Sequence, residues 1–231
     1  MKDKIALCWS SGKDSAYALH VLRREGRYEV VSLLTTMTEG YDRVSMHGVQ
    51  RELVLTQAAA AGLPLRIVWI PQQADNAIYE ARMAEALMEF KSAGVSSIAF
   101  GDLFLEDLKK YREDKLAAAG MTAVFPIWKR DTRELARQMV AEGFRAVLTC
   151  VDTQKLDARF AGREYDLNLL ADLPAGVDPC GENGEFHSFC FAGPIFSHPL
   201  DIRRGEVVLR DERFNFCDVL AKEAWGVRRS A

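Results

Sequence analysis

Short apolar segments alternate with amphipathic segments of helical spacing through the first two thirds of the chain. Within residues 74–93, for example, Met83, Leu87 and Phe90 recur at positions i, i+4 and i+7, on one face of a helix. Parallel strands are joined by crossover segments, usually helices. The alternation therefore predicts an α/β fold, a Rossmann-like doubly wound parallel sheet with helices on both faces. The apolar segments lie at 4–9, 30–35, 65–70, 97–100, 123–125 and 146–151.

The texture of the sequence changes after about residue 152. The segment that follows is rich in Gly, Pro, Asn and Phe and shows no helical period. Residues 194–213 are then typical of a strand, a turn at Arg204-Gly205 and a second strand, and 218–224 of a short terminal helix. The predicted division is an α/β domain over 1–151 and a smaller α+β lobe over 152–231.

Charge balance and cysteine usage limit the class of protein. The chain has 30 Lys and Arg against 33 Asp and Glu, a formal charge of −3 without a basic block, which argues against general nucleic-acid binding. No apolar run approaches the ~20 residues that span a bilayer, and the first residues lack the apolar core of a signal peptide. Five cysteines are scattered without a Cys-x-x-Cys pair, which suits a reducing compartment. We expect a soluble cytoplasmic protein without a membrane partner.

A short polar loop separates the first predicted strand from the first predicted helix. At such a junction, free backbone N–H groups and the positive end of the helix dipole favour an anion. Lys13 adds charge, and Gly12 lets the backbone approach a ligand closely. The loop is not a Walker loop, because the first glycine of that pattern is missing. The sequence predicts phosphate binding, with an ordinary helix-capping loop as the alternative. The loop consists of Ser10, Ser11, Gly12, Lys13, Asp14 and Ser15.

Two aspartates are candidate metal ligands. Asp14 directly follows the loop lysine, where an acidic residue would repel a phosphate unless it held Mg²⁺ or capped the helix. Asp102 follows Gly101 at the carboxyl end of a predicted strand, the edge at which ligands of such sheets bind. Asp102 is therefore expected to contact Mg²⁺ or a phosphate, with a helix N-cap as the alternative.

A second polar segment, Gly-Glu-Asn-Gly-Glu-Phe-His-Ser at 181–188, lies in the C-terminal part. If it is extended, Glu185 and His187 project to the same side. Carboxylates and a histidine in this arrangement favour general-base chemistry, ammonium or hydroxyl recognition, or metal ligation. A polar surface turn at Asn183-Gly184 is the alternative.

The phosphate loop resembles the Ser-Gly-Gly-Lys-Asp-Ser loop of the PP-loop superfamily, the N-type ATP pyrophosphatases, with Ser11 where the commonest form has glycine. The loop, Gly101-Asp102 with Tyr111 and Arg112 downstream, and the 181–188 segment together resemble the diphthine–ammonia ligase family over nearly the whole chain. The eukaryotic and archaeal ligases that act on elongation factor 2 tend to carry a Glu-Gly-Gly-Glu-Phe-Glu segment. Asn183 and His187 depart from it and resemble a bacterial branch, which implies an acceptor other than diphthine.

The resemblance implies an ATP-dependent amide ligase. Such enzymes split ATP into AMP and pyrophosphate, activate a carboxylate as an acyl-adenylate and let ammonia displace AMP. ATP and Mg²⁺ are the implied cofactors; ammonia and a carboxylate acceptor, either a small molecule or a modified protein side chain, are the implied partners. The implied catalytic residues are Lys13, Asp14, Glu185 and His187. The implied ATP-binding residues are the six of the phosphate loop with Thr35, Thr36, Met37, Gly101 and Asp102. The implied substrate-binding residues are His47, Tyr111, Arg112, Glu182, Asn183, Gly184, Glu185 and His187.

Two other functions remain open on the sequence. A PP-loop sulfurtransferase or tRNA-modifying enzyme would use the same ATP-activating domain, but the acidic charge and the absence of paired cysteines argue against it. A non-catalytic regulatory nucleotide-binding module would need neither Lys13-Asp14 nor the second polar segment. The oligomeric state is also open, a homodimer included.

Overall fold

A parallel sheet forms the first part of the computed structural model, which describes residues 2–44 and 47–222. Its strands are β1 (Asp3–Cys8), β2 (Tyr28–Thr38), β3 (Arg43–Val44), β4 (Leu65–Ile70), β5 (Val95–Ala99) and β6 (Thr122–Val124). β1 lies between β2 and β5, with β4 beside β2 and β6 beside β5, all parallel. The short β3 pairs antiparallel with the end of β2. The predicted α/β fold with a doubly wound parallel sheet is confirmed.

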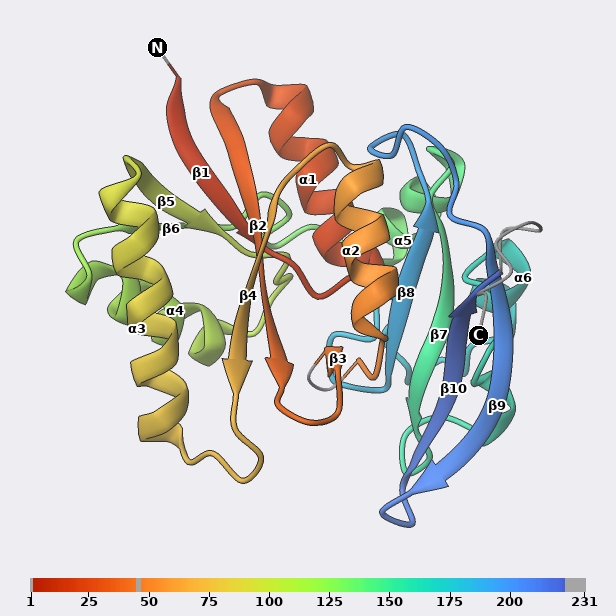
Figure 1. Cartoon of the computed structure of the whole chain (residues 1–231). Coiled ribbons are helices and arrows are strands. Elements are labelled where there is room, and N and C mark those ends of the chain that lie inside the picture. The colour runs from red at the N-terminus through yellow and green to blue at the C-terminus, as the bar shows by residue number, and fades with distance from the viewer. Residues whose placement is uncertain (1, 45–46, 223–231) are drawn as a thin grey trace, which may run out of the picture.

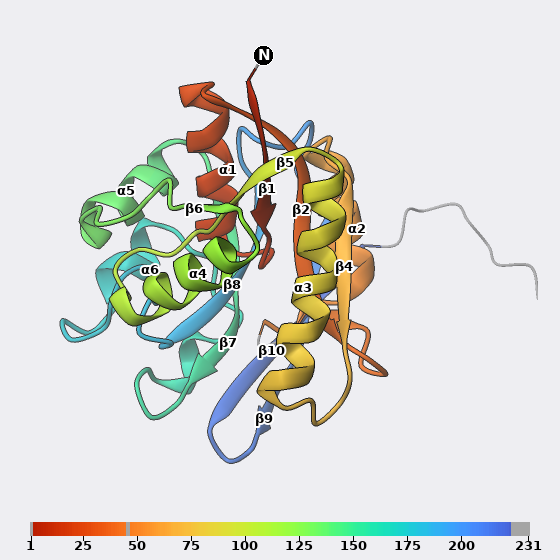
Figure 2. The same ribbon diagram turned by 90° about the vertical axis from the view of Figure 1, so that its left-hand side faces the viewer.

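Helices cover both faces of this sheet. They are α1 (Lys13–Glu25), α2 (Arg51–Ala60), α3 (Asn76–Ser92) and α4 (Glu106–Ala118). α3 and α4 lie on one face, and α1 and α2 lie on the other, between the parallel sheet and the C-terminal part (Figure 1). Figure 2 views the same layers from the side of α3 and α4, which lie nearest the viewer with the parallel sheet behind them. None of the helices in the described part of the chain is long and apolar enough to cross a membrane.

A second, antiparallel sheet forms the C-terminal part in the order β8-β7-β10-β9. Its strands are β7 (Arg145–Asp152), β8 (Phe186–Ala192), β9 (Ile202–Arg210) and β10 (Phe214–Ala221). Shorter helical elements accompany it: α5 (Thr132–Ala141), η1 (Ala158–Phe160) and α6 (Leu167–Asp172). α1 packs against β8, so a single hydrophobic core runs from the parallel sheet into the antiparallel one.

Three expectations about strands are wrong. The apolar segment 146–151 does not close the parallel series but is β7, antiparallel to β8 and β10; a strand buried on both faces has the same apolar pattern in either kind of sheet. No turn occurs at Gly205, because β9 runs through it and the chain reverses at Asp211 and Glu212, both at φ 51°. The predicted helix at 218–224 is the end of β10 up to residue 221, and residues 223 and 224 lie outside the described part.

The change of sheet bears on the division of the chain. β6 is the last strand of the parallel sheet and β7 the first of the antiparallel one. We therefore propose that the C-terminal lobe starts before β7 and not at residue 152. The phosphate loop lies where the two sheets meet.

A buried glutamine ties the phosphate loop into this junction. Gln57 of α2 is fully buried and accepts a hydrogen bond from Trp9 Nε1 at 2.7 Å. Its amide group donates to the carbonyl oxygens of Ser11 and Cys190. The backbone N–H of Cys190 in β8 also donates to the Ser11 oxygen, at 2.9 Å. The phosphate loop is thus held in place by hydrogen bonds from α2 and from β8.

Candidate active site

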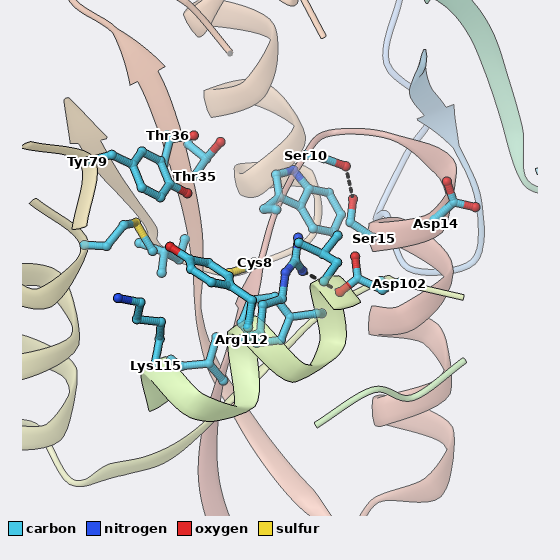
Figure 3. Close-up of a pocket in the computed structure, with 18 of the residues that line it drawn as sticks. Cys8, Ser10, Asp14, Ser15, Thr35, Thr36, Tyr79, Asp102, Arg112 and Lys115 are labelled. Atoms are coloured by element: carbon cyan, nitrogen blue, oxygen red, sulfur yellow. Dashed lines mark hydrogen bonds and ion pairs between the residues drawn. The ribbon is translucent and has the colours of Figure 1, made fainter. Parts of the chain in front are cut away.

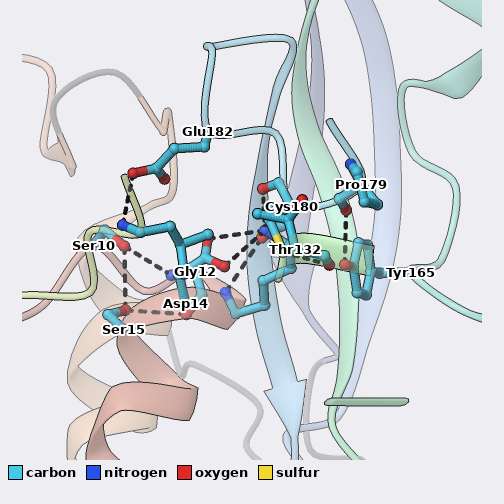
Figure 4. A network of polar contacts seen from close by, with 12 residues as sticks. Ser10, Gly12, Asp14, Ser15, Thr132, Tyr165, Pro179, Cys180 and Glu182 are labelled. Atoms are coloured by element: carbon cyan, nitrogen blue, oxygen red, sulfur yellow. Dashed lines mark hydrogen bonds and ion pairs between the residues drawn. The ribbon is translucent and has the colours of Figure 1, made fainter. Parts of the chain in front are cut away.

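The phosphate loop joins β1 to α1, as the sequence predicts. Gly12 is the N-cap residue of α1 and, having no side chain, makes no capping hydrogen bond, so the capping alternative finds no support at this position. A side chain at Gly12 would come within 3.1 Å of the Ser188 carbonyl oxygen, which explains the glycine. Ser10 and Ser15 point toward each other with their hydroxyl oxygens 3.1 Å apart (Figure 4). The Lys13 backbone N–H at the start of α1 donates to Ser188 Oγ at 3.3 Å, and the positive end of the helix dipole favours an anion beside it.

Ser11 takes a backbone conformation that favours glycine. Its φ is 66°, in the left-handed region, which costs a residue with a Cβ about 1–2 kcal/mol. Glycine, which has no Cβ, would adopt this conformation without that cost. Ser11 is fully buried, and its carbonyl oxygen receives the hydrogen bonds from Gln57 and Cys190 that hold the conformation.

Lys13 is a buried cation that joins the two sheets. Its side chain is 2% exposed, and Nζ donates to both carboxylate oxygens of Asp14, at 2.8 and 3.0 Å, and to the Cys180 carbonyl oxygen. The ammonium also lies 5.2 Å from the ring centre of Tyr165 and 5.3 Å from that of Phe186. Burial lowers the pKa of Lys13, but the charge and hydrogen bonds of Asp14, together with Cys180 and Asp178 nearby, outweigh it and the net pKa is raised. Lys13 therefore stays charged.

Three carboxyl groups line the cavity beside this lysine: Asp14, Asp102 and Glu182. Burial raises the pKa of Asp14 and, despite Arg112, of Asp102. Glu182 accepts a hydrogen bond from the Leu103 backbone N–H at 2.8 Å. Burial, with the nearby charges of Asp14 and Asp102, still raises its pKa to about 7. A carboxyl with such a pKa exchanges its proton near neutrality.

The donor set fits Mg²⁺. This ion is usually held by one or two carboxylates together with phosphate oxygens of the substrate. Asp102 Oδ2 is buried and accepts no directed hydrogen bond within the described residues, although Arg112 Nη1 lies 2.6 Å from it as an ion pair. Residues 2–44 and 47–222 contain no group of three or more His, Cys, Asp and Glu residues that could hold a metal ion. Asp14 and Asp102 are thus suited to a metal ion that arrives with a nucleotide.

Two histidines from distant parts of the chain meet in the cavity. The rings of His47 and His187 have centres 4.5 Å apart. Burial, with each ring's charged or titratable neighbours, lowers the pKa of His47 to about 3 and that of His187 to about 4. His47 Nδ1 is buried without a hydrogen-bond partner in the described part of the molecule. Both imidazoles are therefore neutral at pH 7. The sequence predicts each as a substrate-binding residue, but not their contact.

Outside the phosphate loop, three predicted site residues do not line the cavity. Glu185 is 4% exposed, and its Oε1 accepts hydrogen bonds from the Asp178 backbone N–H and from the Asn183 side chain. Glu185 and Asn183 therefore stabilise the 181–188 segment without facing the cavity. Because β8 begins only at residue 186, Glu185 does not share a face with His187 as expected. Met37 is fully buried in the core cluster. The remaining predicted residues either form the phosphate loop or line the cavity.

The cavity continues beyond the phosphate loop into the space between α3 and α4. Its total volume is about 1180 Å³. Thr35 and Thr36 lie beside Tyr79 at one side, and Arg112 and Lys115 of α4 lie at the other (Figure 3). The α3 residues of the cavity are not predictable from the sequence, because the apolar spacing of that helix is equally typical of a packed core.

Comparison with known proteins places this geometry in a family. The diphthamide synthase N-terminal domain profile matches residues 3–122 and the diphthamide synthase C-terminal domain profile matches residues 131–222. The diphthine–ammonia ligase of Mus musculus is 22% identical over 229 residues, covering 89% of this chain and 85% of that protein. The Homo sapiens diphthine–ammonia ligase is 23% identical over 234 residues with the same coverage.

A solved structure, the U34-tRNA thiolase NcsA from Methanococcus maripaludis, is also similar, at 16% identity. It aligns with a TM-score of 0.38 over 61% of this chain and 58% of that one. The two profiles cover both sheets, the phosphate loop and the 181–188 segment. This chain therefore belongs to the diphthamide synthase family.

Proposed function

We propose that this protein is an ATP-dependent C–N ligase that forms an amide from a carboxylate and ammonia, with ATP split into AMP and pyrophosphate. One observation carries the proposal: the phosphate loop and the 181–188 segment, far apart in sequence, line the same cavity. Contacts between Lys13 and both Cys180 and Ser188 hold them together. The names of the relatives support the reaction type.

ATP would lie along the carboxyl edge of the parallel sheet. The N-terminus of α1, the hydroxyls of Ser10 and Ser15 and the ammonium of Lys13 are the groups suited to the departing pyrophosphate. Thr35 and Thr36 line the cavity at the end of β2 and would lie near the adenosine. Asp14 and Asp102 would hold Mg²⁺, whose charge would offset that of the phosphates.

The acceptor carboxylate would attack the α-phosphorus as the bond to the bridging oxygen breaks and pyrophosphate leaves. Ammonia would then attack the acyl carbon, lose a proton and displace AMP. Within this cavity Glu182 is the best-suited proton acceptor, because its pKa of about 7 lies near the working pH. His187, with a pKa of about 4, is too weak a base for that role at neutrality and is better suited to accept or donate a hydrogen bond to the substrate.

The nucleotide product tests the proposal. The protein would be incubated with Mg-ATP, ammonium and a metabolite extract, beside Asp14→Asn and the matched control Asp107→Asn on the exposed side of α4. We expect AMP and pyrophosphate from the wild type and the control, and at least a hundredfold less from Asp14→Asn. ADP and phosphate as products would contradict the proposal, and ATP bound without turnover would favour a regulatory module.

A further inference from the structure

The space between α3 and α4 is an apolar groove that the nucleotide-binding loop does not account for. We define the α3–α4 groove by Met83, Leu87 and Met88 of α3, Leu108 and Leu116 of α4, and Ile98 on its floor. The groove and the phosphate-binding end form one continuous cavity of about 1180 Å³. Single small-molecule sites usually measure roughly 300–1,000 Å³. The cavity therefore has room for a second substrate next to a nucleotide.

The floor of the groove is buried and its rim is open: Leu87, Ile98 and Leu116 belong to a buried core cluster, whereas apolar side chains at the rim are exposed. Met88 is 61% exposed and Tyr111 is 42% exposed, although each belongs to a helix that lies on a sheet. Of the residues of α4, only Leu116 is buried. Apolar surface left open beside a reaction centre favours a ligand that removes it from water.

The charges at the groove are already paired. Arg112 forms an ion pair with Asp102 at 2.6 Å and lies 4.3 Å from the centre of the Phe100 ring. Lys115 forms an ion pair with Glu80 at 2.7 Å. Among the described residues these are the two basic side chains that line the groove, so it offers no free cation to a second phosphate or carboxylate. The occupant is expected to be uncharged along its body.

Glu80 also limits the width of the groove. Its carboxylate accepts a hydrogen bond from Tyr111 Oη at 3.2 Å as well as the Lys115 ion pair, so α3 and α4 are joined across the rim. A folded protein segment cannot lie down between two joined helices, whereas a hydrocarbon chain or a ring can enter from the phosphate-loop end. This contact favours a small molecule over a macromolecule.

We propose that the α3–α4 groove binds the apolar body of the acceptor, and that the acceptor is a small monocarboxylic acid with a hydrocarbon chain or an aromatic ring. The inference rests on the proposed function, which supplies the carboxylate. With its apolar body in the groove, the acid directs its carboxylate out toward the phosphate loop, where the α-phosphorus would lie. In the adenylation step a carboxylate oxygen bonds to that phosphorus and pyrophosphate leaves, and the reverse step restores ATP.

ATP–pyrophosphate exchange detects this step without a nitrogen source. The probes are octanoate and trans-cinnamate as apolar acids, with succinate and glutamate as polar ones. We expect the apolar acids to stimulate exchange at least tenfold over the acid-free rate and the polar acids to leave it unchanged. Stimulation by the polar acids alone would overturn the proposed acceptor class and leave the ligase function standing.

A groove-filling substitution separates the acid from the nucleotide. Ala84→Trp on α3 places a large ring in the cavity, and Glu85→Trp is the matched control, because residue 85 is exposed and does not line the cavity. Binding of octanoate and of α,β-methylene-ATP would be measured by calorimetry. We expect Ala84→Trp to weaken octanoate binding at least tenfold and the nucleotide analogue less than twofold, with Glu85→Trp like the wild type.

The reverse pattern, with loss of the nucleotide analogue and unchanged octanoate, would assign the groove to ATP and overturn the inference. Octanoate binding that depends on residue 84 without any exchange would keep the groove as an acid site and count against the ligase function. Should Ala84→Trp fail to fold, Met88→Glu at an exposed position serves instead. Its added negative charge is expected to weaken octanoate binding, and unchanged binding there would also contradict the inference.

Discussion

The two faces of the parallel sheet differ in how completely their helices are covered by the rest of the protein. α1 and α4 each have 13 residues, but α1 buries eight of them and α4 only one. The face that carries α1 is sealed by the antiparallel sheet through a shared core. The face that carries α3 and α4 has no third layer within the described residues, and a cavity lies between the helices.

The difference separates two tasks of one site. The groups suited to the phosphates of ATP, at the start of α1, lie at the sealed face, where burial and hydrogen bonds fix their positions, as catalysis by electrostatic stabilisation requires. The groups that would select the acceptor lie at the open face, where side chains can change with little effect on the core. We expect substitutions at the sealed face to affect catalysis and stability, and those at the open face to affect substrate choice.

The largest effect is expected at Lys13. Lys13→Met keeps the apolar stem but removes the charge that would stabilise departing pyrophosphate, so AMP formation should fall about 10²–10³-fold. The measurement is single-turnover AMP formation from Mg-ATP, with Lys110→Met on α4 as the control for loss of an exposed lysine. A rate of AMP formation by Lys13→Met within threefold of the wild-type rate would contradict a catalytic role for the residues of the sealed face.

Gln57 tests the stability of the sealed face. Gln57→Leu leaves the Trp9 indole N–H and the carbonyl oxygens of Ser11 and Cys190 without this partner. We expect the free energy of unfolding to fall by about 3 kcal/mol, since each unpaired buried polar group costs about 1–3 kcal/mol. Urea unfolding of this variant beside Met88→Leu, an exposed apolar change with an effect within about 0.5 kcal/mol, measures the contrast. Equal losses of unfolding free energy in Gln57→Leu and Met88→Leu would contradict the difference between the two faces.

The histidine pair makes stability depend on pH. In the folded protein the pKa values of His47 and His187 are about 3 and about 4, below their usual 6.5. Between pH 6.5 and 4 the unfolded chain thus binds more protons, and stability falls as the pH is lowered through this range. We expect the melting temperature of His47→Gln/His187→Gln to fall less between pH 7 and 4 than that of the wild type. Parallel curves would contradict the burial of neutral imidazoles.

The smallest effect is expected at the rim of the open face. Glu80→Ala removes the contacts with Tyr111 and Lys115 that join α3 to α4. Because exposed ion pairs add little to stability, the melting temperature should not change measurably. Hydrogen exchange should nevertheless become faster in the amides of α4 and stay unchanged in α1. Equal acceleration in both helices would show that the two faces are not independent.

Much of the site could be predicted because its signals are local. The phosphate loop combines a strand end, a glycine and a helix start within a few residues. Each of these local features can be recognised without knowing how the rest of the chain folds. The errors concern partners that the sequence does not specify. β7 has the apolar pattern of any buried strand, so only its neighbours reveal the sheet to which it belongs. The position of Glu185 depends on where β8 begins, a matter of a single residue.

The groove between α3 and α4 was not predictable for a different reason. Met83, Leu87 and Phe90 share a helical face, which is typical of core packing, and Leu87 and Phe90 do belong to a core cluster. Met83, at the same spacing, packs against that cluster and, like Leu87, also lines the cavity. Periodicity identifies the apolar face of a helix but not whether another part of the protein covers it.

The hydrogen bonds from Lys13 to Cys180 and Ser188 have a consequence for inheritance. The lysine of the phosphate loop is positioned by residues that follow it 167 and 175 positions later in the chain. A gene fusion that carried only the phosphate loop and the parallel sheet into another protein would lose these partners, and with them the Tyr165 and Phe186 rings that lie against the lysine. The phosphate loop and the C-terminal lobe are therefore expected to be inherited as one unit. A substitution in either of them then limits which substitutions in the other are tolerated.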